Sequence, residues 1–168
     1  MWKKILILSG CLVLTGAIWF AGFEVVYAHI MAFVTNILLG LGGSESEVGV
    51  TQQNGAYAFE ALINIDGQDA LISRRFFDTL YPTIMILAWV AFVSIINGWR
   101  NGVKAITWTL LPFFLTQIVF LLLFTNYMSS TANYMYYILQ DSFYVIALAA
   151  IIIESIRRDV FKSGGRLR

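Results

Sequence analysis

One carboxylate inside an apolar segment is the residue of this sequence best placed to do chemistry. Asp141 lies within the apolar stretch 134–153, which predicts a membrane-spanning helix. At a rise of 1.5 Å per residue, it would lie about two turns from the start of that helix. A charge at this depth costs on the order of a few kcal/mol and usually faces a partner or a water-filled cavity. Asp141 is therefore predicted to mark a polar site within the membrane.

Gln117 is the predicted neighbour of Asp141. It lies about eight residues before the outer end of the apolar segment 105–125, and both side chains would then lie about 10–12 Å below the outer boundary. The short connection 126–133 makes the two helices neighbours. Because polar groups in lipid must find partners, we expect Gln117 to donate a hydrogen bond to Asp141. The pair is interpreted as a structural clasp, as a proton- or ion-handling site, or as a contact with another subunit.

Two tyrosines extend this site along the same helix. Tyr137, Asp141, Tyr144 and Leu148 recur at a spacing of three to four residues, which places them on one helix face. Tyrosine hydroxyls can satisfy a carboxylate, although aromatic stripes are more often packing surfaces. The predicted intramembrane polar site thus comprises Asp141, Gln117, Tyr137 and Tyr144.

The composition places these residues in a membrane protein. Of the 168 residues, 59% are hydrophobic, 12% are charged and the mean hydropathy is +0.75, whereas soluble domains carry about 25% charged residues. So much apolar surface cannot fit inside a core of this size, so lipid is its natural solvent. The sequence predicts an all-α integral membrane protein.

Four apolar segments are each near the roughly 20 residues that cross a bilayer. We predict a single membrane domain over 1–168, with a short strand-containing outer loop between the first two of four transmembrane helices. Pro112, inside the third helix, removes a backbone hydrogen bond and favours a kink, so it is a hinge candidate or simply shapes packing. Trp19 and Trp89 lie deep in their segments and are expected at helix–helix contacts. The predicted parts are spans at about 5–24, 79–97, 105–125 and 134–156, the outer loop 44–77 and a basic tail 157–168.

The first apolar segment continues to residue 41, which is too long for one span. It either divides into two spans near Glu24 or continues as an extended or interfacial helix over 25–41. We favour the second alternative, because residues 21–24 offer few turn residues and the glycines at 40, 42 and 43 supply a helix stop.

The basic residues support four spans. Nine of the 11 lysines and arginines then fall on one side, which leaves Arg74 and Arg75 on the other. The positive-inside rule places that side, with both termini and the loop 97–104, in the cytoplasm. The C-terminal residues of this set form a predicted cytoplasmic anchor: Arg157, Arg158, Lys162, Arg166 and Arg168.

The outer loop predicts two short strands. Apolar runs flank Asp66 and Gly67, and Asp-Gly between such runs is typical of a β-hairpin. The loop is interpreted as an ordered segment packed on the helix ends or as a binding platform. The second span is expected to begin at Asp78 or Thr79 as its cap, with Pro82 in its first turn.

No enzymatic or metal-binding pattern is present in the sequence. Cys11 is the single cysteine, and no phosphate loop, zinc-protease helix, metal-ligand spacing or nucleic-acid motif is found. The layout of apolar helices around a strand-like outer loop resembles the terminal part of exosortase-type membrane transpeptidases. That family uses a cysteine near the outer face and a basic partner within the helices. Cys11 is predicted near the cytoplasmic side, so the resemblance implies no activity, although an accessory role in such a system stays open.

These observations predict a non-enzymatic small integral membrane subunit of a larger bacterial inner-membrane complex, such as secretion, conjugation or envelope-processing machinery. Its expected partners are the lipid bilayer and other membrane subunits, as a hetero- or homo-oligomer, with no cofactor, metal or nucleic acid. The alternative is a small channel or transporter subunit that uses Asp141 and Gln117 as its polar site.

Overall fold

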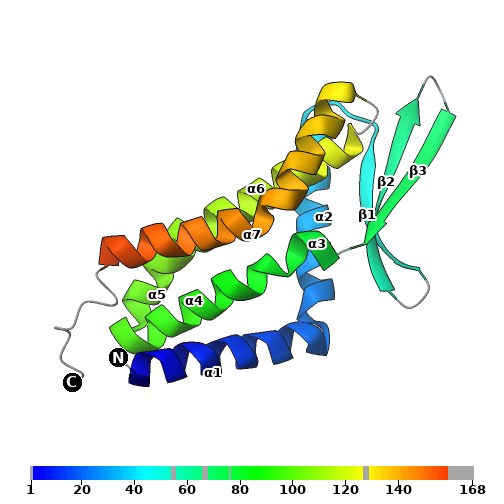
Figure 1. The fold of residues 1–168 in the computed structure, drawn as a ribbon. Helices are drawn as coiled ribbons and strands as arrows, with labels where there is room; N and C mark the ends of the chain where they lie inside the picture. Colours follow the sequence, from blue (N-terminus) through cyan, green and yellow to red (C-terminus); the bar gives the residue numbers. More distant parts are fainter. Residues whose placement is uncertain (1, 54–55, 66–67, 76, 127–128, 159–168) are drawn as a thin grey trace. The chain divides into compact units, whose positions relative to one another are not determined.

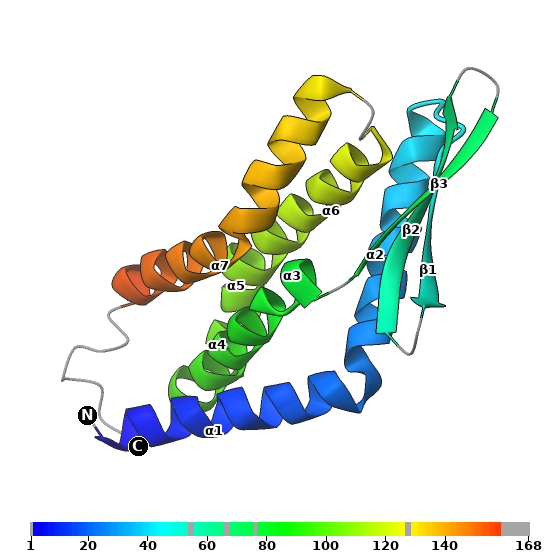
Figure 2. The same cartoon turned by 45° about the vertical axis from the view of Figure 1, so that its right-hand side comes forward.

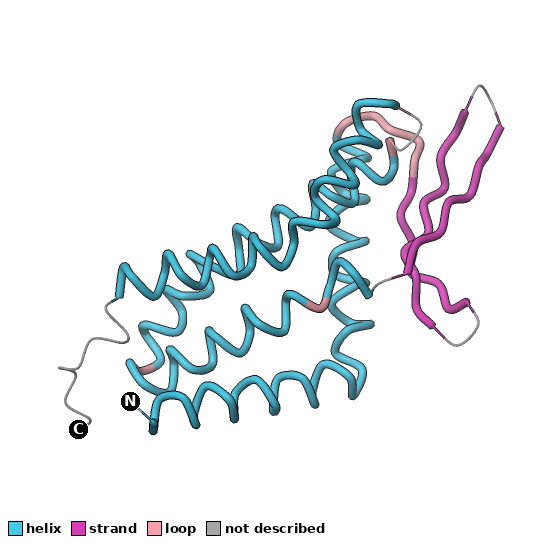
Figure 3. Tube along the Cα trace, in the orientation of Figure 1, coloured by secondary structure: helices cyan, strands magenta, loops and turns pink. Residues whose placement is uncertain are grey.

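The computed structural model describes residues 2–53, 56–65, 68–75, 77–126 and 129–158 and consists of helices with one small sheet (Figures 1 and 3). Three helical stretches of the described chain are long and apolar enough to cross a membrane: Trp2–Leu41, Trp99–Thr125 and Ser130–Arg157. The elements are α1 (Trp2–Ile18), η1 (Trp19–Phe23), α2 (Glu24–Leu41), β1 (Glu47–Gln53), β2 (Ala56–Ile65), β3 (Gln68–Arg75), α3 (Phe77–Leu80), α4 (Pro82–Asn97), α5 (Trp99–Ala105), η2 (Ile106–Leu110), α6 (Leu111–Thr125) and α7 (Ser130–Arg158).

The chain forms two compact units. The first unit contains Met1–Ala21, Tyr81–Phe114 and Tyr144–Arg168, and the second contains Gly22–Leu80 and Leu115–Phe143. Helices α6 and α7 therefore each contribute residues to both units. The single membrane domain predicted from the sequence stays a prediction.

The first unit has a core in which α1 packs against α4. Cys11 of α1 is buried beside Trp89, Phe92 and Val93 of α4, and the indole of Trp89 lies 5.4 Å from the ring of Phe92. The deep tryptophans Trp19 and Trp89 are both buried, as their positions in the sequence indicated. The cysteine thus fills space in an apolar core.

The predicted loop 97–104 is wrong, because the chain reverses within one residue. Gly98 has a φ of 85°, a conformation that glycine adopts without strain, and α5 begins at the next residue. Gly102 of α5 then approaches Ser94 of α4 so closely that a Cβ at position 102 would overlap the serine side chain. The α4–α5 hairpin therefore depends on a residue without a side chain at position 102.

Two helical stretches depart from a regular α-helix. The stretch to Leu41 is kinked rather than continuous, because Gly22 in η1 has a non-helical φ of 121° and α1 and α2 are two helices that meet there. The helix expected over 25–41 is present as α2, and its role as an extension of the first span stays a prediction. In the second stretch, the π-helical turn η2 ends at Leu110, two residues before Pro112. Proline cannot donate to a carbonyl one turn back and its ring crowds that carbonyl, so a local change in helical winding at this place has a clear steric cause.

The predicted cap of the second span is also wrong. Asp78 and Thr79 belong to the short helix α3, whereas α4 begins at Pro82 with Tyr81 as its N-cap residue. Proline is well suited to the first helical position because the N–H that it lacks would have no partner there. The single residue Tyr81 therefore separates two helical segments.

The second unit holds an antiparallel sheet of order β1-β2-β3. The strands β2 and β3 were predicted, although the turn at Asp66 and Gly67 lies outside the described residues, and β1 was not predicted. Helix α2 lies along β1 (Figure 2). The amide of Asn36 joins them, because its Nδ2 donates to the Val48 carbonyl at 2.9 Å and its Oδ1 accepts from the Val48 N–H at 2.8 Å.

Replacing Gly102 with alanine tests the hairpin contact. We expect Gly102→Ala to lower the free energy of unfolding by about 1–3 kcal/mol, the usual cost of overpacking a tight contact. Thermal unfolding of the purified protein in detergent measures the change. Gly10→Ala is the matched control, because a Cβ at position 10 meets nothing within 4 Å. Equal melting temperatures for both variants would contradict this role for Gly102.

Candidate functional site

The predicted site residue Gln117 is completely buried and joins three elements of the second unit. The hydroxyl of Tyr27 on α2 donates to its Oε1 at 2.7 Å, and its Nε2 donates to the backbone carbonyl of Thr79 on α3 at 2.7 Å. Both polar ends of the amide are thus used by partners from helices other than α6. An amide with this role fixes α2, α3 and α6 to one another.

The structure does not bring Asp141 and Gln117 together. Asp141 is exposed on α7, and within the described part of the chain no hydrogen bond or ion pair reaches its carboxylate. The predicted clasp fails because the Gln117 amide already has partners of its own, which a comparison of helix depths could not foresee.

Asp141 instead lies at the centre of an exposed stripe on α7. At about 100° per residue, the members of this stripe point within about 60° of Asp141. The buried residues Tyr136, Phe143 and Ala147 occupy the opposite face. The Asp141 stripe consists of Tyr134, Tyr137, Asp141, Tyr144, Leu148 and Ile152, all exposed.

The remaining predicted site residues have separate surroundings. Tyr137 has a described polar partner, because Nη2 of Arg74 lies 3.4 Å from its hydroxyl, whereas Tyr144 is half exposed. Pro112 is the second residue of α6, and its role as a hinge stays a prediction. In the basic anchor, the guanidinium of Arg157 lies 4.0 Å from the ring centre of Trp108, a cation–π distance. The Arg158 side chain and residues 159–168 lie outside the described part.

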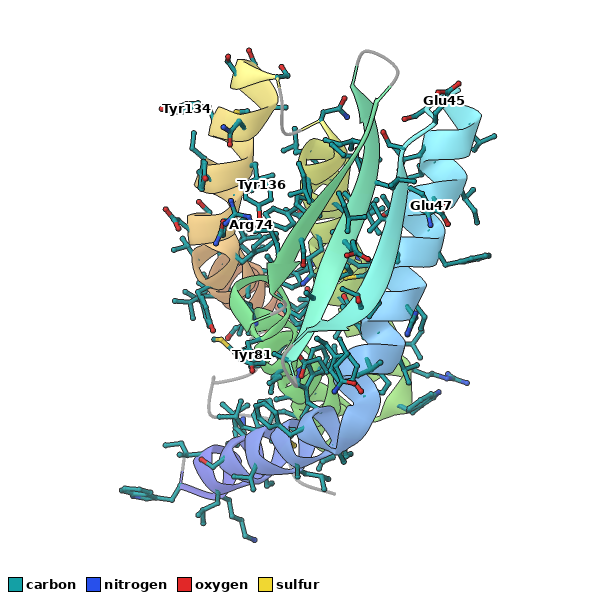
Figure 4. All side chains as sticks on the ribbon, turned by 90° about the vertical axis from the view of Figure 1, so that its right-hand side faces the viewer. Glu45, Glu47, Arg74, Tyr81, Tyr134 and Tyr136 are labelled. Carbon is teal, nitrogen blue, oxygen red and sulfur yellow. The ribbon has the colours of Figure 1, made fainter. Side chains whose placement is uncertain are left out.

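A pocket of about 310 Å³ lies within the second unit, between β2 and β3 and the helices α3, α6 and α7. Phe59 and Arg74 are directly paired across β2 and β3, so they share the sheet face that lines it. Figure 4 shows Arg74 and Tyr136 next to each other, and the guanidinium carbon lies 6.0 Å from the ring centre. The lining residues are Phe59, Ser73, Arg74, Thr79, Phe120, Leu121, Phe124, Tyr136 and Gln140.

Aromatic rings form the rigid wall of this pocket. Tyr136 stacks on Phe120 with ring centres 4.4 Å apart, and Phe124 lies 6.0 Å from Tyr136. At the same wall, Oε1 of Gln140 is buried and accepts no hydrogen bond from the described residues. The pocket lining therefore combines aromatic rings, the guanidinium of Arg74 and the Gln140 amide oxygen, which has no donor among the described residues.

A second, apolar groove of about 420 Å³ lies within the first unit, between α1, α4 and the C-terminal part of α7. Leu148 and Ile152 of the Asp141 stripe line it, together with Trp89 of α4. This concave apolar surface of the first unit has a shape that can accept another helix or a lipid chain.

Sequence reasoning missed Arg74, Tyr136 and Gln140 as pocket residues. Arg74 entered only as one of the two basic residues on the outer side of the predicted topology. The strand register that pairs Arg74 with Phe59 was the missing information, because the register decides which side of the sheet a residue faces.

No protein-family model, curated protein or solved structure matches the chain significantly. The function must therefore be inferred from the chemistry of the chain itself.

Replacing Gln117 tests its role as a structural bridge. We expect Gln117→Leu to lower the free energy of unfolding by about 2–4 kcal/mol, because a buried tyrosine hydroxyl and a backbone carbonyl both lose their partner. Tyr27→Phe should cost about 1 kcal/mol. Thermal unfolding in detergent measures both, with Tyr144→Phe as the exposed control. Unchanged stability in Gln117→Leu would exclude the bridging role.

Proposed function

We propose that this protein is a non-enzymatic integral membrane subunit of a larger bacterial inner-membrane complex. One observation carries the proposal: the carboxylate of Asp141 is exposed on an apolar helix and has no polar partner among the described residues. An ionised carboxylate facing lipid would cost a few kcal/mol, so a partner from another chain is the simplest way to satisfy it.

The surroundings of Asp141 suit a neighbouring helix. The Asp141 stripe repeats at three- and four-residue intervals, the spacing by which helices pack side by side. Tyr137 and Tyr144 flank the carboxylate and supply large, rigid contact surfaces with hydroxyls at their tips. We infer that the partner presents a transmembrane helix with a basic or hydrogen-bonding residue at the level of Asp141.

The proposed topology has four spans with both termini in the cytoplasm, in the bacterial inner membrane. Besides the three long helical stretches, α4 is proposed as a membrane crossing and is the second along the chain. Its 16 residues measure about 24 Å, which is enough to cross where the bilayer is thinned or where the adjoining α3 extends the helix. Helix α2 packs along β1, and the free edges of a sheet are not tolerated in hydrocarbon. This favours α2 as an extension of the first span outside the hydrocarbon rather than as a fifth span.

A channel or transporter subunit was the alternative. It required Asp141 and Gln117 to share one polar site, and the described contacts of Gln117 serve to join helices instead. We therefore propose the subunit role and no second function. Secretion, conjugation and envelope processing all remain suitable processes for such a subunit.

Neutralising Asp141 tests the subunit role. A photo-crosslinking residue placed at Leu148, on the stripe, should join the protein to another membrane protein in cells, whereas one at Ile153, exposed but about 120° away, should not. Asp141→Asn should reduce the Leu148 crosslink and the amount of partner that co-purifies by about tenfold, the effect of losing a charge-assisted hydrogen bond. Ile153→Ala is the control. A stable monomer without crosslinks, or equal yields with Asp141→Asn, would contradict the proposal.

Cysteine labelling tests the topology. In a Cys11→Ser background, Glu45→Cys should react with a membrane-impermeant maleimide in intact spheroplasts, because position 45 is exposed and predicted outside. Arg100→Cys should react only after permeabilisation. Five spans, with a second crossing over 25–41, would reverse both results, because position 45 would then face the cytoplasm and position 100 the outside. Labelling of Arg100→Cys in intact spheroplasts would therefore exclude the four-span arrangement.

A further inference from the structure

We propose that the pocket of the second unit binds the headgroup of a phospholipid that carries a hydrogen-bond donor. This goes beyond a subunit role, because it assigns the outer part of the chain a ligand of its own. The donor-bearing headgroups are those that end in an amine or a hydroxyl, such as ethanolamine and glycerol.

The charge in the pocket selects an anionic group. Arg74 is the charged residue among the described lining residues, and the guanidinium binds phosphate through several parallel N–H donors. Its carbon lies 6.0 Å from the ring centre of Tyr136, and Nη2 lies 3.4 Å from the hydroxyl of Tyr137. These contacts hold the guanidinium at the pocket wall.

The pocket contains one buried hydrogen-bond acceptor that has no donor among the described residues. Oε1 of Gln140 is buried without a described hydrogen bond, and leaving such an acceptor unmatched costs about 1–3 kcal/mol. Gln140 follows Tyr136 by four residues, about one helical turn on α7, so it lies about 6 Å further along the helix. A phosphate at Arg74 would therefore place an amine or hydroxyl of the same headgroup within reach of Gln140.

The position of the pocket along the helices favours lipid over a free solute. The spanning stretch Ser130–Arg157 has 28 residues, or about 42 Å, against a hydrocarbon core of about 30 Å. If it is centred, about 6 Å at each end lies among the headgroups, and Tyr136 falls near the boundary. Phe124 is next to the last residue of α6. The outer part of the pocket, at Tyr136 and Phe124, thus lies near the level of the lipid phosphates, and Gln140 lies deeper, below the hydrocarbon boundary.

The volume and the wall also fit a headgroup. About 310 Å³ is at the small end of ligand pockets, enough for a polar headgroup and its glycerol but not for whole acyl chains. The rings of Phe59, Phe120 and Phe124 present apolar surface on which the glycerol and the first chain carbons can pack. The acyl chains would then continue outside the pocket along lipid-facing helix surfaces.

Native mass spectrometry of the full-length protein tests this proposal. The protein is released from detergent containing equal amounts of phosphatidylethanolamine, phosphatidylglycerol and phosphatidylcholine, which carries phosphate but no headgroup donor. We expect at least one donor-bearing lipid to be retained about fivefold more than phosphatidylcholine. Arg74→Gln should lower its retention about tenfold, with partial rescue by Arg74→Lys, as expected for a charge-assisted contact. The matched control Arg100→Gln should leave it unchanged.

Two further arms separate the alternatives. Gln140→Leu should bring retention of the donor-bearing lipid down to that of phosphatidylcholine, because the donor then has no acceptor. Equal retention of all three lipids by the wild type, or an unchanged Arg74→Gln, would overturn the proposal. Displacement of the lipid by millimolar inorganic phosphate would also overturn it, because the pocket would then recognise the free anion.

Discussion

The second unit depends on a single buried amide. Gln117 is an amide on an otherwise apolar helix, and in a nonpolar environment each of its polar ends must be matched or cost a few kcal/mol. Tyr27 and the Thr79 carbonyl match them at 2.7 Å, which holds α2 and α3 against α6. Thr79, which belongs to this bridge, and Phe120, three residues after Gln117, both line the pocket. The bridge therefore positions the elements from which the pocket is built.

The contrast between Gln117 and Asp141 shows how polar residues divide their roles on apolar helices. An amide can be satisfied within a chain because it both donates and accepts, and the fold supplies Tyr27 and Thr79 for this purpose. A carboxylate only accepts and carries charge, and the described part of the chain supplies it with no donor. The polar group that the chain leaves open is thus the one that another molecule can complete.

Composition and periodicity predicted the parts of this fold that depend on local sequence. The long apolar helices, the helix over 25–41, the buried tryptophans and the strands β2 and β3 follow from hydrophobic runs, glycines and a hairpin pattern. The kink at Gly22 was not predicted, because one glycine within a long apolar run gives only a weak turn signal. The turn at Gly98 and the start of α4 at Pro82 were misplaced by a few residues, because charged or polar residues nearby looked like loop and cap residues. The charges of Arg100 and Lys104 predict one side of a membrane by the positive-inside rule, and residues of an exposed short helix can carry such charges as well as residues of a loop can.

The partners of Gln117 and the pocket could not be predicted from the sequence, because both depend on contacts between segments far apart in the chain. Tyr27 is 90 residues from Gln117, and Arg74 is 63 residues from Tyr137. Depth along a helix is readable from a sequence, but the direction of a side chain around the helix depends on which neighbour packs there. Gln117 and Asp141 have similar predicted depths, yet one points into the unit and the other away from it. A polar residue in an apolar helix therefore predicts that a partner exists, while the packing of the rest of the chain decides whether that partner is internal.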